Sequence, residues 1–291
     1  MSTTGALGRF TDENLIQTAV LGGGQWSAEL PLANLKDEAR FISRPTRQLF
    51  PADPAKSRID IDLDRDRTIN LIGVLFHTLG PAAEYRISIA APGGALDAPT
   101  FTTGWKPVHG RMFPSVNLAW EEPNWWTGAG RPEDLLLYPQ HLWVSLDPAI
   151  KATAVRVELK DPEAAYFDIG GLWVCGAWSP QFNFDHGREL GLEARSLADE
   201  APSGRVFHED RASRRRLTVT WSMLDQNEAM RLFDAGARAG TRRPVILLPD
   251  VNDPVALMRE AFPATFEKPP APRRGRRFEN TIAATFKEII A

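Results

Sequence analysis

Short segments in which apolar and charged side chains alternate recur through the first 180 residues of the chain. In residues 59–64 isoleucine and leucine alternate with aspartate, and in residues 154–160 valine and leucine alternate with charged residues. A period of two is that of a β-strand with one buried face. Residues 69–77 form an apolar run that suits a strand covered on both faces, and residues 64–68 between them suit a charged turn. We therefore expect residues 14–179 to form a β-sandwich.

Residues 166–180 are expected to be the last strand of this sandwich and the start of a connection. Gly170 and Gly171 interrupt an apolar run, which indicates a bulge or a close approach of another backbone. Pro180 ends the strand. Residues 180–205 are rich in glycine, aspartate and glutamate, so we expect them to connect two domains.

The last third of the chain predicts a second β-sheet domain with one helix, over residues 206–291. Asp225 is a good N-cap, Glu228 completes a capping-box pattern, and Gly240 supplies a stop, so the helix should span residues 226–239. Strands are expected at residues 214–222, 244–249 and 278–290. The fold class is therefore mainly β, and the polar residues 1–13 are expected to be a flexible arm.

The composition excludes several classes of protein. The formal net charge is −3, so the whole chain is no polyanion binder, and the single cysteine, Cys175, rules out an intrachain disulfide. The first 20 residues carry charges and lack the apolar core of a signal peptide. The longest clean apolar run, Leu71–Phe76, is far shorter than the roughly 20 residues of a membrane span. We expect a protein made in the cytoplasm, without membrane insertion.

No pattern of residues predicts an enzyme, a cofactor or a metal site. The five histidines are scattered without metal-ligand spacing, and no nucleophile elbow, P-loop or dinucleotide fingerprint occurs. Asp62, Asp64 and Asp66 have the spacing that opens a calcium loop, but Arg67 stands where the turn glycine belongs. Glu121 and Glu122 are adjacent in the sequence, and adjacent carboxylates rarely face one substrate as a glycosidase pair must.

Two sets of side chains are candidates for a binding surface. The first is a group of tryptophans among glycines and prolines: Trp105, Trp120, Trp125 and Trp126. They suit a platform for sugars or a protein partner, and equally a cover over an open end of the sandwich. The second is basic: Arg214, Arg215, Arg216, Arg273, Arg274, Arg276 and Arg277. These suit solvated loop ends, or a surface that faces an acidic partner or passing DNA.

The first domain resembles the galactose-binding-like, discoidin-type jelly roll. The matching segments are Trp26–Leu35, the strand pair Ile59–Val74, the later strand Ala154–Leu159 and the final strand Asp168–Trp173, with Asp64 where a glycine is usual in that fold. The resemblance implies a jelly-roll sandwich. The alternative function is a carbohydrate-binding module for a host surface glycan, with the four tryptophans as its platform.

The second domain resembles tail-tube and distal-tail proteins of tailed phages and gene transfer agents. The matching segments are the strand Leu217–Trp221, the helix core Glu228–Leu232 and the strand Pro244–Asp250 before a long final strand. The resemblance implies a structural virion protein at the tail tip, without a catalytic site. Such proteins form rings, commonly hexameric, between tail tube and baseplate, and DNA passes through the channel. The arginines would then face the lumen or a neighbouring subunit.

Overall fold

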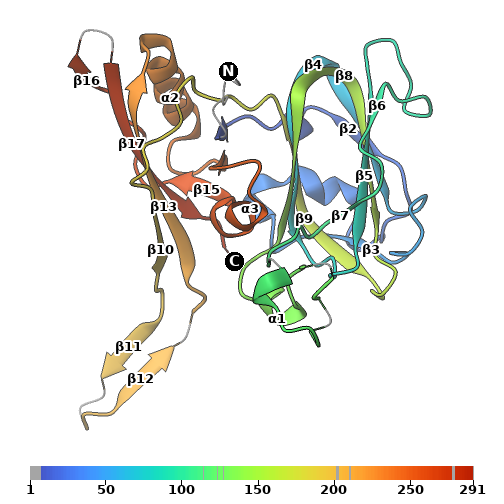
Figure 1. The fold of residues 1–291 in the computed structure, drawn as a ribbon, viewed down its shortest axis with the longest axis horizontal. Helices are drawn as coiled ribbons and strands as arrows, with labels where there is room; N and C mark the ends of the chain where they lie inside the picture. The colour runs from blue at the N-terminus through green and yellow to red at the C-terminus, as the bar shows by residue number, and fades with distance from the viewer. Residues whose placement is uncertain are drawn as a thin grey trace. The chain divides into compact units, whose positions relative to one another are not determined.

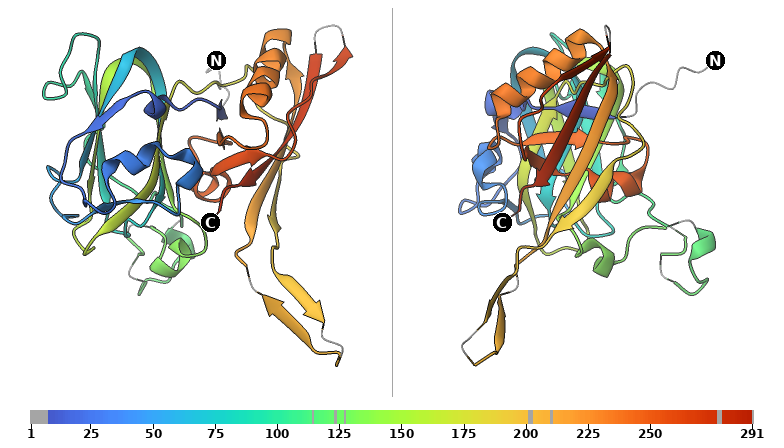
Figure 2. Two further views of the ribbon diagram at one scale, coloured as in Figure 1. Left: turned by 180° about the vertical axis from the view of Figure 1, so that it is seen from behind. Right: turned by 90° about the vertical axis from the view of Figure 1, so that its left-hand side faces the viewer.

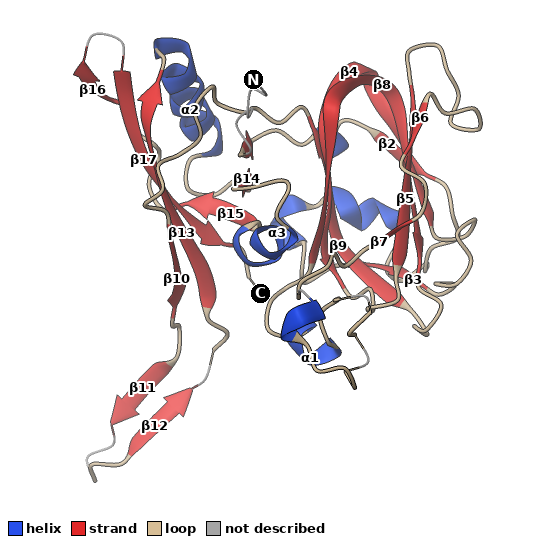
Figure 3. Cartoon of the chain, in the orientation of Figure 1, coloured by secondary structure: helices blue, strands red, loops and turns tan. Residues whose placement is uncertain are grey.

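A computed structural model describes residues 8–290 except 114, 123, 127, 201–202, 210 and 277–278. The chain is mainly β, with antiparallel sheets and few helices, as the sequence predicts (Figure 3). It divides into two compact units. The sandwich unit comprises Glu13–Ala177 with Val251–Arg259. The C-terminal unit comprises Trp178–Asp250, the chain from Glu260 onward, and the N-terminal segment up to Asp12.

The sandwich unit is built on an eight-stranded antiparallel sheet in the order β3-β9-β4-β8-β5-β6, with β2 beside β4 and β7 beside β5 (Figure 1). Its strands are β2 (Val20–Gly22), β3 (Thr46–Gln48), β4 (Arg58–His77), β5 (Glu84–Ala90), β6 (Phe101–Thr102), β7 (Lys106–Pro107), β8 (His141–Lys160) and β9 (Phe167–Cys175). Its helical turns are η1 (Leu15–Gln17), η2 (Leu32–Lys36), η3 (Glu38–Arg40), η4 (Ser115–Asn117), α1 (Pro132–Leu135) and α3 (Pro254–Glu260).

The long strands β4 and β8 pair along their whole length and belong to both layers of the sandwich. The first half of β4 pairs with the second half of β8, which also pairs with β5, whereas the second half of β4 pairs with β9. The expected turn at residues 64–68 is wrong: β4 continues through it, with a register irregularity between Asp62 and Arg67. A bulge bends a strand without ending it, so one hairpin can serve two layers.

The two glycines of β9 lie against Phe41, as the expected close approach requires. A Cβ on Gly170 would lie 2.1 Å from the Phe41 carbonyl oxygen, and one on Gly171 would lie 2.4 Å from the Phe41 ring. Both contacts are shorter than any side chain tolerates. The glycines therefore allow the turn after η3 to pack directly on the strand.

The C-terminal unit is built on a seven-stranded sheet in the order β1-β14-β15-β17-β13-β10, with β16 beside β17. Its strands are β1 (Arg9–Thr11), β10 (Glu189–Glu193), β13 (Arg214–Leu224), β14 (Val245–Leu248), β15 (Pro263–Phe266), β16 (Arg273–Arg276) and β17 (Glu279–Glu288). The buried face of β13 and β17 carries Leu217, Val219, Trp221, Ile282 and Phe286, and the helix α2 covers it.

The helix α2 (Gln226–Ala239) has the predicted bounds. Asp225 accepts a hydrogen bond from the backbone N–H of Glu228 at 2.7 Å, and the Glu228 carboxylate accepts one from the N–H of Asp225 at 3.2 Å. This reciprocal cap satisfies two backbone donors that a helix start leaves unpaired. Among the described residues, no helix has the length and apolar character that crossing a membrane requires.

The expected flexible arm over residues 1–13 is wrong for its described part. Arg9–Thr11 form β1, which pairs with β14, and Phe10 is 3% exposed. Phe10 also exchanges two backbone hydrogen bonds with Trp178, both at 2.8 Å. The segment is ordered because its one large apolar side chain fills the core of the C-terminal unit. Residues 1–7 lie outside the described part of the chain.

The expected connection over residues 180–205 is also wrong in part, since it contains two strands. β10 pairs with β13 over five residues, from Glu189–Thr218 to Glu193–Arg214. β11 (Leu197–Glu200) then pairs with β12 (Val206–Glu209) in a separate two-stranded hairpin. In both views of Figure 2 this golden hairpin extends beyond the end of the larger sheet. Its polar composition reflects exposure rather than a lack of strand structure.

Candidate functional site

Residues 108–140, between β7 and β8, form the longest excursion of the sandwich unit without a strand among the described residues. Backbone and side-chain hydrogen bonds give it a defined shape. The N–H groups of Met112 and Phe113 donate to the Gly128 carbonyl at 2.8 and 2.9 Å. The Asn124 amide donates to the Ala129 carbonyl at 2.7 Å. Three of the four candidate tryptophans lie on the turn that these contacts hold.

Trp120, Trp125 and Trp126 form a single cluster, which we call the tryptophan cluster. The ring centroids of Trp120 and Trp125 are 4.7 Å apart, those of Trp125 and Trp126 4.6 Å apart, and those of Trp120 and Trp126 6.0 Å apart. The rings are strongly inclined to one another, with Trp125 and Trp126 at 89°. Trp120 is 72% exposed and Trp126 78% exposed, so neither ring covers the sandwich core.

Polar groups border the tryptophan cluster. The Arg131 guanidinium bonds both Glu122 oxygens, at 2.8 and 2.9 Å, and Glu121 is exposed beside it. Val116, Leu136 and Leu137 of the same excursion are also largely exposed. Apolar rings with charged and amide neighbours are suited to a ligand that has both an apolar face and hydroxyl groups.

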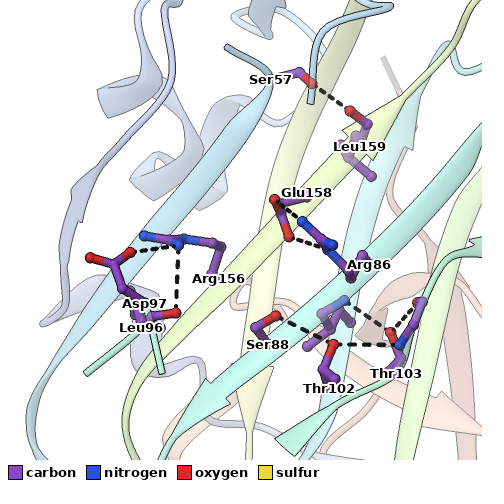
Figure 4. Close-up of polar contacts among 12 residues, drawn as sticks. Ser57, Arg86, Ser88, Leu96, Asp97, Thr102, Thr103, Arg156, Glu158 and Leu159 are labelled. Carbon is purple, nitrogen blue, oxygen red and sulfur yellow. Dashed lines mark hydrogen bonds and ion pairs between the residues drawn. The ribbon is translucent and has the colours of Figure 1, made fainter. Parts of the chain in front are cut away.

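Trp105 does not join this cluster. Its ring lies beneath the Arg86 guanidinium, 4.8 Å from the centroid, and the Lys160 ammonium is 5.6 Å away. Glu158 holds Arg86 through two hydrogen bonds of 2.6 and 2.7 Å, drawn in Figure 4, and these bonds raise the pKa of Arg86. Trp105 therefore packs against charged side chains of β5 and β8 and lies apart from the other three tryptophans.

The three consecutive arginines of β13 have different environments. Arg214 is paired with Glu193 at 2.8 Å, and this bonding lowers the pKa of Glu193 to about 2. Arg216 is paired with Glu267 at 2.8 Å. Arg215 is 1% exposed, so the expectation that it faces a lumen or a neighbour is wrong. Arg215 and Leu217 are two positions apart in β13, so their side chains lie on the same, buried face of the strand.

The second arginine group lies on β16, which pairs with β17. Arg273 and Arg274 are exposed, and Arg276 closes the described part of the strand. Arg277 lies outside the described residues. These residues remain candidates for a surface that meets an acidic partner.

The structure also brings together residues that the sequence leaves apart. The rings of His77 and His109 are 5.6 Å apart, and burial lowers the pKa of His77 to about 3. His109 and His141 line a cavity of about 190 Å³ in the sandwich unit, with Tyr85, Gln140 and Trp143. No spacing signals this group, because its members come from the ends of strands that are neighbours only in the fold.

Neither a family model nor a curated protein matches the sequence. Among solved structures, the chain is similar to a family 32 carbohydrate-binding module from C. perfringens in complex with galactose, with 14% identity, a TM-score of 0.35, and coverage of 55% of this chain and 96% of that one. It is also similar to chitosan-binding module 1 of a chitosanase/glucanase from Paenibacillus sp. IK-5, with 16% identity, a TM-score of 0.36, and coverage of 56% and 99%. The lectin domain of Lectinolysin complexed with Lewis B antigen gives 12% identity, a TM-score of 0.36, and coverage of 56% and 96%.

Proposed function

We propose that the chain binds glycans and that the tryptophan cluster is its platform. The observation that carries this proposal is the exposure of two clustered indoles, 72% for Trp120 and 78% for Trp126, on a turn held by hydrogen bonds. A sugar ring has an apolar C–H face that an indole can cover and hydroxyl groups that the border residues can bond. Three inclined rings offer faces in more than one direction, which suits an oligosaccharide better than a flat partner.

The test is binding of the purified full chain to a broad glycan array, followed by titration of any ligand found. Trp126→Ala and Trp120→Ala should each weaken oligosaccharide binding at least tenfold, because the sugar loses an aromatic ring on which it stacks. Both side chains are exposed, so the substitutions should change the free energy of unfolding little. Phe233→Ala is the matched control, because Phe233 is an aromatic residue of α2 in the C-terminal unit and is 48% exposed. Absence of binding across the array would refute the proposal. Selective binding of a protein in place of a glycan would mean that the tryptophan cluster is a protein-binding surface.

A second function rests on the β11–β12 hairpin: a ring-forming structural protein of the distal tail or baseplate, located at a virion tail tip. Leu197, Val206 and Phe207 are each about half exposed on this hairpin. Exposed apolar side chains on a projecting pair of strands favour pairing with another chain. The partners would be further copies, six in the commonest arrangement, with tail-tube and baseplate proteins as neighbours and DNA passing through the ring.

The ring is tested by native mass spectrometry and electron microscopy of the chain with and without residues 197–209, replaced by a short glycine–serine turn. We expect closed rings for the full chain and monomers for the shortened one. Phe233→Ala, at an exposed position on α2, serves as the control and should leave the rings intact. Identical assembly with and without the hairpin would remove its proposed role.

A further inference from the structure

The cavity beside His109 and His141 has the dimensions of a site for one small group. Its volume is about 190 Å³. Drug-sized ligands occupy pockets of roughly 300–1,000 Å³, so this cavity is suited to a single ring with its substituents. It lies wholly within the sandwich unit: Tyr85 and Trp143 come from β5 and β8, Met112 from the excursion that carries the tryptophan cluster, and Leu257 from α3.

The walls of the cavity carry no formal charge. None of the described residues that line it is aspartate, glutamate, lysine or arginine. Burial also lowers the pKa of His109, so its imidazole is neutral at physiological pH. A buried charge without a partner is strongly unfavourable, so an ionic ligand would be rejected here. The occupant should therefore be neutral.

The polar side chains of the cavity offer both acceptors and donors. His141 Nδ1 accepts a hydrogen bond from the Phe76 backbone N–H at 3.2 Å, so the His141 ring carries its proton on Nε2, which is a donor. The neutral His109 ring donates from Nε2 to the Leu79 carbonyl at 3.0 Å, which leaves Nδ1 as an acceptor. The Gln140 amide N–H₂ donates to the carbonyls of Leu135 and Tyr138 at 2.6 and 2.8 Å, which leaves its oxygen as an acceptor. The Tyr85 side chain is 8% exposed and lines the cavity, and its hydroxyl can both donate and accept a hydrogen bond.

These features together identify the class of ligand. The acceptors on His109 and Gln140, together with the Tyr85 hydroxyl and the His141 N–H, suit a ligand that brings hydroxyl groups, because a hydroxyl both donates and accepts hydrogen bonds. Trp143, Leu257 and Met112 offer apolar contacts to its carbon skeleton. We infer that this cavity is a second carbohydrate subsite that holds one neutral sugar residue. The inference rests on the proposed glycan-binding function, but it assigns different residues from the tryptophan cluster.

The experiment titrates galactose, glucose, mannose, N-acetylglucosamine and galacturonate into the full chain by ligand-observed NMR. At least one neutral sugar should bind, and galacturonate should bind at least tenfold more weakly than galactose or not at all. Tyr85→Phe removes only the hydroxyl and should weaken monosaccharide binding about three- to tenfold with an unchanged melting temperature. Leu257→Trp fills the cavity and should abolish monosaccharide binding.

Trp126→Ala separates this inference from the proposed function. Monosaccharide binding should survive Trp126→Ala, whereas oligosaccharide binding should fall. If oligosaccharides bind through Trp126 while none of the neutral monosaccharides binds, the cavity holds only water and the inference fails alone. Monosaccharide binding that neither Tyr85→Phe nor Leu257→Trp weakens would also overturn it. Failure of every glycan to bind would overturn both proposals.

Discussion

Arg215 and Glu288 form an ion pair inside the C-terminal unit. The Arg215 guanidinium lies 2.5 Å from Glu288 Oε1, the Arg215 backbone N–H donates to Oε2 at 2.8 Å, and the Phe262 ring centroid is 4.7 Å from the guanidinium carbon. Their side chains are 1% and 2% exposed. Removing one member of such a pair leaves a buried charge without compensation.

We therefore expect Glu288→Gln to lower the free energy of unfolding by about 3–5 kcal/mol in urea titrations. Glu267→Gln weakens the more exposed pairs with Arg216 and Lys287 and should cost less than about 1 kcal/mol for each pair. The double variant Arg215→Met with Glu288→Leu should recover most of the loss, since two apolar groups need no partner. Equal effects of the two single variants would mean that burial does not govern this pair.

His77 gives the sandwich unit a pH dependence. Burial, with a smaller contribution from neighbouring His109, lowers its pKa from 6.5 to about 3. The unfolded chain then binds more protons than the folded one, so the stabilisation is complete above pH 6.5 and is lost as the pH falls from there toward 3. The loss should approach about 1.4 kcal/mol per pH unit.

The measurement is the free energy of unfolding between pH 7.5 and about 5, by denaturant titration. His77→Gln should reduce the slope of stability against pH, although it lowers stability at every pH. His208→Gln, on the exposed β12, should leave the slope as it is. A wild-type slope in the His77→Gln variant would show that His77 does not carry the effect.

At the scale of the elements, β9 depends on the absence of two side chains. Gly171→Ala would place its Cβ 2.4 Å from the Phe41 ring and should destabilise the sandwich unit by about 1–3 kcal/mol in thermal or urea unfolding. A double-mutant cycle with Phe41→Leu should show compensation for Gly171→Ala and none for Gly170→Ala, whose obstacle is a backbone oxygen. Gly22→Ala, with no atom within 4 Å, is the matched control. Strict additivity at Gly171 would contradict this account.

At the scale of the whole molecule, the two units have separate hydrophobic cores, and the N-terminal strand belongs to the core of the last third of the chain. Phe10 lies 6.1 Å from Phe266 and 6.3 Å from Phe286 between ring centroids. Phe10→Ala should cost about 3–5 kcal/mol. Hydrogen exchange should show lost protection in β13 and β17 with β4 and β8 unchanged, and Phe207→Ala should change neither. Equal loss of protection in both units would mean that they unfold as one.

Part of the candidate site could be predicted from the sequence alone. Three tryptophans within seven residues, among prolines and glycines, already indicate a turn with clustered rings, and the structure brings these three together. That Trp105 lies apart depends on Arg86 and Glu158, which are 72 positions apart in the sequence. The cavity could not be predicted from the sequence either. Which polar atoms of its lining side chains can accept a hydrogen bond depends on the hydrogen bonds that the other atoms of the same side chains make in the fold.

The features that could be predicted are local ones. Alternation places β4, β8 and β17, and a capping box with a terminal glycine places α2, because a few neighbouring residues decide whether a segment is a strand or a helix. Strand partners are decided at long range. Arg9–Thr11 could become β1 only because β14, more than 230 positions later, leaves an edge open to it. The same holds for Arg215, whose charge is tolerated in the core because strand pairing brings Glu288 to the position beside it.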